Sequence, residues 1–299
     1  MTATAHARTE AARPSFEIDV EDVTYLTHGD KPLLARLYKP KGNGPFPVMI
    51  DLHGGAWCNG DRTNDAVLSE ALARSGVLVV AIDFRMPPDA AYPGSLADIN
   101  YAVRWVRANA AKLKARPDRI GYIGISSGGH QGMLAAMRPS DPRYAAVQTA
   151  EVPKGDAGVQ CVVLCWPVID PLGCYRLAKE TVAKGGDYPP NMKNVIPLHD
   201  LYWGGEAQME EASPPAILAR GEAIDTLPPV LYVQGDADRM HPRPHLERFV
   251  ELYRKRGGSV DLVLYPGEVE GFVTREAKSE ANKRAATERI VTFVHQALA

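Results

Sequence analysis

The stretch RIGYIGISSGGH, residues 119–130, decides the fold of this chain. An apolar, β-rich run leads into GISSG (124–128), and a helical pattern follows. This is G-x-S-x-G between a strand and a helix, the context in which a nucleophilic serine stands on a tight turn. Glycines are needed there because the turn leaves no room for side chains beside a strained serine. We therefore predict Ser126 as the nucleophile; a glycine-rich turn with an incidental serine is the weaker alternative. Ser127 is in the wrong register, since Ile125 would then replace the first glycine.

Similar runs recur along the chain and alternate with helical patterns. The other predicted strands are 16–27, 33–38, 47–54, 77–84, 160–167, 229–236 and 260–267, and the predicted helices are 64–75, 95–114, 128–137, 244–257 and 277–298. Most of these strands are rich in Val, Ile and Leu without alternation, as expected of strands buried on both faces. The pattern predicts an α/β fold: a mostly parallel sheet of eight strands, with helices on both faces and an antiparallel edge where the opening strands meet.

One long stretch interrupts this alternation. Residues 170–228 contain no clear strand but many glycines, prolines and aromatic residues, and a connection of this length is usually functional. We interpret it as a small cap inserted in a single domain that spans 16–299. Residues 1–15 lack the apolar core of a secretory signal and are predicted to be a disordered tail.

Composition excludes several classes of function. Of 299 residues, 45% are hydrophobic, enough for one large core or two modest ones, and the net charge is −2. Without a basic excess, neither a nucleic acid nor an anionic membrane is expected as a partner. The four cysteines form no CxxC pair, and no apolar run is long enough to cross a membrane. We expect a cytoplasmic protein without a metal site that acts on a small molecule; the oligomeric state stays open, and a homo-oligomer is compatible with the sequence.

Two further loops follow predicted strands, where ligands bind in open α/β sheets. The first reads HGGAW (53–57), and its glycines let backbone N–H groups approach a developing negative charge. We assign the amides of Gly55, Ala56 and Ser127 to an oxyanion hole and give His53 a bracing role. The second loop reads DADRMH (236–241); either of its aspartates can fill the acidic position of a catalytic triad, or both can be ordinary turn residues.

These motifs together resemble the hormone-sensitive-lipase-like and kynurenine-formamidase-like (feruloyl-esterase-like) branches of the α/β-hydrolases. The resemblance rests on HGGAW, DFRMPPDAAYPGSLADINYAVRWV, PDRIGYIGISSGG, SPP and PPVLYVQGDAD, and covers about 46–141 and 214–272. It implies hydrolysis of carboxylic esters or formamides, without a cofactor, through a Ser–Asp–His triad. The second aspartate of GDAD serves in those families, which points to Asp238. The resemblance also implies a structural role for His130.

The chain departs from these families at one decisive position. After the last strand they carry a motif close to YPGxxHGF, and here residues 265–272 read YPGEVEGF, with Glu270 in the place of the histidine. Three explanations remain open. In the first, His241, which follows Asp238, supplies the base. In the second, a neighbouring carboxylate raises the pKa of Glu270, which then acts as acid and base in a non-hydrolytic reaction such as a lyase reaction, C–C cleavage or isomerisation. In the third, the pocket only binds a ligand.

An apolar pocket is expected around these groups, because most small-molecule sites are apolar. The candidate walls are aromatic residues that can equally be core: Trp57, Trp166, Tyr188, Tyr202 and Trp203. The position of Glu270 predicts that it lies within hydrogen-bonding reach of Asp238 or His241 and close to Ser126.

Overall fold

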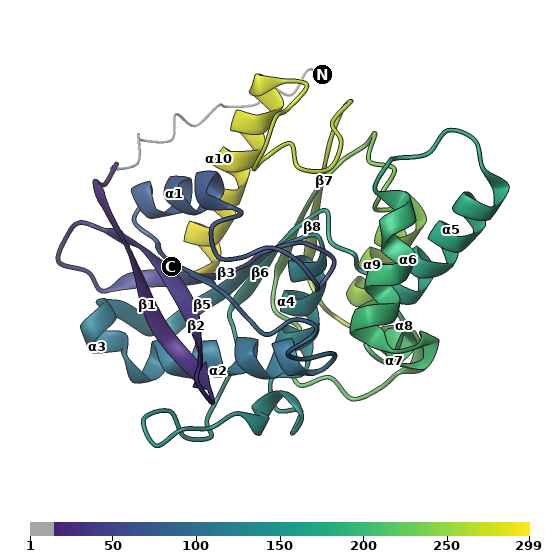
Figure 1. The fold of residues 1–299 in the computed structure, drawn as a ribbon. Coiled ribbons are helices and arrows are strands. Elements are labelled where there is room, and N and C mark those ends of the chain that lie inside the picture. The colour runs from purple at the N-terminus through teal and green to yellow at the C-terminus, as the bar shows by residue number, and fades with distance from the viewer. Residues whose placement is uncertain (1–14) are drawn as a thin grey trace.

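The computed structural model describes residues 15–299, and its centre is an eight-stranded sheet (Figure 1). The strands lie in the order β1-β2-β4-β3-β5-β6-β7-β8. Their bounds are β1 (Ile18–His28), β2 (Lys31–Pro40), β3 (Phe46–Leu52), β4 (Leu78–Ile82), β5 (Ala115–Ile125), β6 (Cys161–Cys165), β7 (Val230–Gly235) and β8 (Val260–Tyr265). From β4 to β8 every neighbouring pair is parallel, whereas β1 and β2 form an antiparallel edge. The predicted fold class is therefore confirmed. The predicted tail falls outside the described residues, apart from Ser15.

Helices cover both faces of the sheet. Their bounds are α1 (Ala66–Arg74), α2 (Gly94–Ala108), α3 (Ala110–Leu113), α4 (Ser127–Met137), α5 (Pro171–Lys184), α6 (Met192–Trp203), α7 (Glu206–Glu211), α8 (Pro214–Arg220), α9 (Arg243–Lys255) and α10 (Glu280–Ala297), with a short 3₁₀ turn at Tyr144–Ala146. The prediction of one helix over 95–114 was wrong in part, because the chain breaks at Asn109 into α2 and α3.

Two hydrophobic cores result from the alternation of side chains along the central strands. On one face, Ile50 of β3 and Tyr122 of β5 pack with α2, α4 and α9. On the other face, Met49 and Ile123, one residue along in each strand, pack with α1 and α10, which lie side by side (Figure 1). Burial on both faces explains why these strands read as continuous apolar runs.

Four helices, α5 to α8, connect β6 to β7 in the segment for which the sequence predicted a cap, and we use the name cap for these four helices. They gather on one side of the molecule next to α9 (Figure 1). Among the described residues, no helix is long and apolar enough to cross a membrane.

Candidate active site

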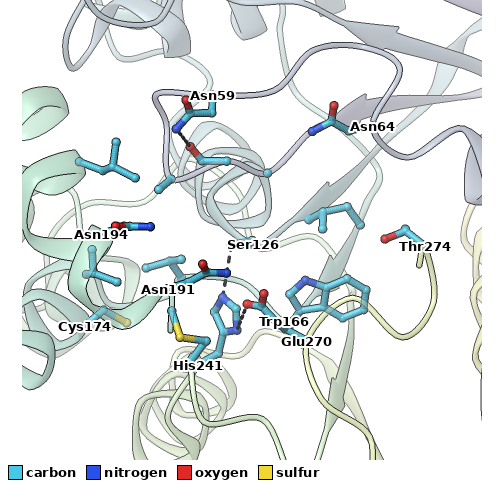
Figure 2. A pocket seen from close by; sticks show the side chains of 18 of the residues that line it. Asn59, Asn64, Ser126, Trp166, Cys174, Asn191, Asn194, His241, Glu270 and Thr274 are labelled. Carbon is cyan, nitrogen blue, oxygen red and sulfur yellow. Dashed lines mark hydrogen bonds and ion pairs between the residues drawn. The ribbon is translucent and has the colours of Figure 1, made fainter. Parts of the chain in front are cut away.

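A cavity of about 490 Å³ opens at the carboxyl edge of the sheet. Its lining comes from the segments after β3, β5, β6, β7 and β8 and from the cap helices α5 and α6. Ser126 lies near the centre of the cavity, between the cap side and the side that holds Trp166 and Thr274 (Figure 2). The topology thus brings the predicted loops together, as expected for an open α/β sheet.

The turn after β5 has the strained geometry that its sequence predicted. Ser126 has φ 51° and ψ −116°, a left-handed conformation that residues with a side chain rarely adopt. A Cβ atom on Gly124 would lie 2.6 Å from the carbonyl oxygen of Gly128. One on Gly128 would lie 2.0 Å from the carbonyl oxygen of Leu52. Both glycines are therefore required for α4 to pack against the ends of β5 and β3.

The loop after β3 lies directly against this turn. A Cβ atom on Gly54 would be 3.3 Å from the Cβ of Ser126, and Gly54, Gly55 and Ala56 all line the cavity. The amide of Trp57 donates a hydrogen bond of 3.2 Å to Ser127 Oγ, which joins the two loops. This proximity agrees with an oxyanion hole formed by Gly55, Ala56 and Ser127, and that assignment stays a prediction.

The loop after β7 brings an imidazole to the nucleophile. His241 Nε2 lies 3.3 Å from Ser126 Oγ, and His241 Nδ1 lies 2.8 Å from Asp238 Oδ2. Asp238 Oδ1 accepts hydrogen bonds from the amides of Met240 and His241, which holds the loop in a tight turn. The side-chain amide of buried Gln234 donates to the carbonyl of His241. The ring is thus fixed both through its side chain and through its backbone.

Burial and neighbouring charges have opposite effects on the pKa values of Asp238 and His241. Burial would raise the pKa of Asp238, but the charge and hydrogen bond of His241 and two backbone amides lower the pKa below its ordinary value. Burial would lower the pKa of His241, but Asp238 and, more weakly, Glu270 raise it. With Nδ1–H donating to Asp238, the lone pair of Nε2 faces the Ser126 hydroxyl.

Glu270 comes from the loop after β8 and approaches the same imidazole on the Nδ1 edge, beside Asp238. Its Oε2 atom is 4.0 Å from His241 Nδ1, an ion-pair distance that is longer than a hydrogen bond. Its Oε1 atom is 3.4 Å from Arg275 Nη2. Glu270 and Ser126 line the same cavity, on either side of His241 (Figure 2). In this structure, therefore, it is His241 that contacts the serine.

Two further carboxyl groups, those of Asp65 and Asp51, lie at the cavity wall and beneath it. Asp65, at the start of α1, lines the cavity but is only 5% exposed, and Asp51 of β3 is buried next to it. Asp51 accepts a hydrogen bond of 2.6 Å from Ser69. Burial raises the pKa of Asp51 to about 6, and burial together with the charge of Asp51 raises the pKa of Asp65 well above its ordinary value. The sequence does not mark this pair, because neither residue belongs to a recognisable motif.

The prediction of aromatic cavity walls was mostly wrong, because most of these residues belong to the core. Trp166 lines the cavity as predicted. Trp57, Tyr202 and Trp203 are at most 2% exposed and pack on one another, with ring centroids 4.8–5.6 Å apart. This cluster joins the loop after β3 to α6 of the cap. Within the described part of the chain, Tyr188 is not among the lining residues either.

The cap instead contributes aliphatic and polar groups to the cavity. Val195 and Leu198 of α6 form an apolar wall, with His199 beside them and Asn191 and Asn194 nearby (Figure 2). No motif marks these residues in the sequence, so only the packing of α6 over Ser126 identifies them.

Two further histidines near the site, His53 and His130, contact backbone carbonyl oxygens. His53 Nδ1 contacts the carbonyl oxygen of Gly54 at 2.8 Å, and its ring stacks on Phe84, in agreement with a bracing role. His130 is buried in α4 and contacts the carbonyl oxygen of Ala212 at 2.9 Å. Across residues 15–299, no group of three or more potential ligands is placed to hold a metal ion.

The sheet order, the strained serine turn and the loops around it define an α/β-hydrolase fold. Solved structures agree: an esterase from Pyrobaculum calidifontis covers 94% of this chain, and 86% of that protein is matched, with a TM-score of 0.73 at 24% identity. Carboxyl esterase 2 from Tuber melanosporum covers 95%, with 89% of its own chain matched, a TM-score of 0.73 and 23% identity. More particularly, the chain belongs to the BD-FAE family, whose profile matches residues 36–251.

Curated relatives include two proteins of Mycobacterium tuberculosis. Esterase LipC is 31% identical over 76% of this chain, but only 53% of LipC is matched. Carboxylesterase NlhH is 28% identical over 86% of this chain, with 76% of NlhH matched. The chain thus spans about half the length of LipC, and other curated relatives are likewise matched over only part of their length.

Proposed function

We propose that the protein is a serine hydrolase of small carboxylic esters or amides, with Ser126 as nucleophile, His241 as general base and Asp238 as the group that orients the imidazole. One observation carries this proposal: Ser126 Oγ, the His241 ring and Asp238 form a continuous series of contacts at 3.3 and 2.8 Å. Nucleophilic acyl transfer recurrently uses this arrangement, in which a hydroxyl contacts a base and the base contacts an orienting carboxylate. The names of the relatives, esterase and carboxylesterase, support the same reaction class.

The chemical steps follow from this geometry. His241 Nε2 takes the proton of Ser126 as Oγ attacks the carbonyl carbon of the substrate, and Asp238 stabilises the imidazolium that forms. The oxyanion develops where the amides of Gly55, Ala56 and Ser127 can donate to it. His241 then returns the proton to the leaving alcohol or amine, and a water molecule activated in the same way cleaves the acyl-enzyme.

The contacts favour His241 over Glu270 as the base. Glu270 approaches the imidazole at Nδ1, the nitrogen that already faces Asp238, whereas Ser126 is at Nε2. A proton leaving Ser126 therefore passes to His241. The non-hydrolytic and binding-only alternatives arose because the expected histidine was replaced. Because His241, from another loop, lies beside Ser126, the absence of a histidine at position 270 no longer favours these alternatives.

Turnover of 4-nitrophenyl acetate and butyrate, with fluorophosphonate labelling, tests the proposal. Ser126→Ala should abolish labelling, and both Ser126→Ala and His241→Ala should lower kcat by roughly three orders of magnitude or more. His28→Gln is a matched histidine control, since His28 pairs with Asp98 away from the cavity. Full turnover by the Ser126→Ala variant, or a wild-type protein that is neither labelled nor active on any short acyl ester or amide, would refute the proposal.

A further inference from the structure

We propose that Glu270 and Arg275 are a pair of positioning residues that set the basicity of His241 with opposite signs. Glu270 acts as a second carboxylate on the Nδ1 edge of the ring, and Arg275 limits its effect. This inference rests on the proposed role of His241 as base.

The contacts place Glu270 between the His241 imidazole and the Arg275 guanidinium. One carboxylate oxygen faces His241 at 4.0 Å, and the other faces the Arg275 guanidinium at 3.4 Å. The Glu270 side chain is 26% exposed, so most of it is withdrawn from the solvent that would screen its charge. A carboxylate so placed interacts with the ring without replacing Asp238, which keeps the hydrogen bond to Nδ1.

The loop after β8 folds back so that Arg275 can reach this position. Gly271 has φ 85°, and its carbonyl oxygen accepts hydrogen bonds from the amides of Thr274 and Arg275. A Cβ atom on Gly271 would lie 2.4 Å from Arg275 Nε, so the guanidinium packs directly over the glycine. Both charges therefore come from one short, internally hydrogen-bonded turn and keep a fixed order: ring, carboxylate, guanidinium.

The charged groups with the largest effect on the pKa of His241 come from two loops, and Asp65 at the start of α1 lines the same cavity and interacts with Arg275. Asp238 belongs to its own loop, and Glu270 and Arg275 belong to the loop after β8. Ser126, from the turn after β5, is neutral. Glu270 raises the pKa of His241 and Arg275 lowers it, while Asp238 has the larger effect. Removing the negative charge of Glu270 should therefore lower the pKa of His241, and removing the positive charge of Arg275 should raise it.

The experiment is a set of pH profiles of kcat/KM for 4-nitrophenyl butyrate. Neutral His241 is the active form, so activity is lost as the pH falls through its pKa. Glu270→Gln should move this acidic limb to lower pH, and Arg275→Gln should move it to higher pH. Each shift should be at most about one unit, because the Arg275 side chain is 63% exposed and water screens the pair. The double variant should return close to the wild-type limb, and Arg275→Lys, which keeps the charge, should leave it in place.

An NMR titration of the His241 imidazole provides the second readout and needs no turnover. It separates the two proposals, because the ring can titrate as described even in a protein that hydrolyses no ester. Opposite shifts in the two single variants support the inference. Shifts in the same direction, or no shift in either variant, overturn it while leaving a Ser126-dependent esterase intact. Loss of activity without a change in the NMR titration would assign Glu270 a merely structural role and would also overturn it.

Discussion

The buried carboxyl group of Asp51 should make the protein less stable as the pH rises. Its pKa is about 6 in the folded protein, against an ordinary value of 3.8, because burial disfavours the charged form. Below pH 3.8 the group is protonated in both states and has no effect. Between 3.8 and about 6 the unfolded chain releases its proton first, and the free energy of unfolding falls by about 1.4 kcal/mol per pH unit. Above that range the loss stays constant at about 3 kcal/mol.

Replacing Asp51 by Asn should remove this loss. Asn keeps the shape and an oxygen that can accept the hydrogen bond of Ser69. It also removes the negative charge that raises the pKa of Asp65, which adds to the gain at high pH. We therefore expect Asp51→Asn to match the wild type near pH 4 and to exceed its stability by about 3 kcal/mol or more at pH 8.

Urea unfolding at pH 4, 6 and 8, followed by circular dichroism, measures this difference as a change in midpoint. Ser69→Ala is the matched control with the opposite sign. It removes the hydrogen bond that lowers the pKa of Asp51, so the loss of stability at high pH should become larger. A gain for Asp51→Asn that is equal at all three pH values, or no gain at pH 8, would refute the reasoning.

Three further changes test the fold around the site. Gly128→Ala should destabilise the protein and abolish fluorophosphonate labelling, because the new Cβ atom would lie 2.0 Å from the carbonyl oxygen of Leu52; a labelled, stable variant would contradict the close packing described. Trp203→Ala should cost about 3–5 kcal/mol in urea unfolding, since the side chain is only 2% exposed within the aromatic cluster, and a cost below 1 kcal/mol would place it outside the core. Glu268→Gln should cost about 2 kcal/mol, because buried Glu268 accepts hydrogen bonds from the amides of Lys278 and Ser279 at the start of α10; protection of the α10 amides from hydrogen exchange should fall with it.

The sequence was sufficient for the sheet and for the strained turn that carries Ser126, because both depend on local patterns. Strands buried on both faces are apolar without alternation, and the serine turn needs small residues at fixed positions. The choice between His241 and Glu270 could not be made in the same way. It depends on whether the chain after Asp238 returns toward β5, and that return is held by hydrogen bonds from two amides and from Gln234.

The walls of the cavity were harder still to predict. Trp57, Tyr202 and Trp203 have the composition of a ligand site but pack on one another, and only Trp166 faces the cavity. Which aromatic residues face a ligand depends on how the cap lies over the sheet, and hydrophobic periodicity does not encode that. Arg275 and Asp65 were missed for a related reason, since each is an ordinary loop residue until the fold brings it to the cavity.

The position of Asp238 and His241 in a single turn, three residues apart, bears on how the site can vary. In a protein that draws its acid and base from two separate loops, both loops must hold their geometry at once. Here the spacing between the carboxylate and the imidazole is set within one hydrogen-bonded turn, which Gln234 also holds. The start of the turn is anchored to the segment after β8, because the amide of Ala237 donates a hydrogen bond to the carbonyl oxygen of Glu268. Beyond Glu268, the loop after β8 need not supply a histidine to the proposed triad, so loop exchange at 270–276 should alter the pH range and selectivity of the protein before it alters the reaction.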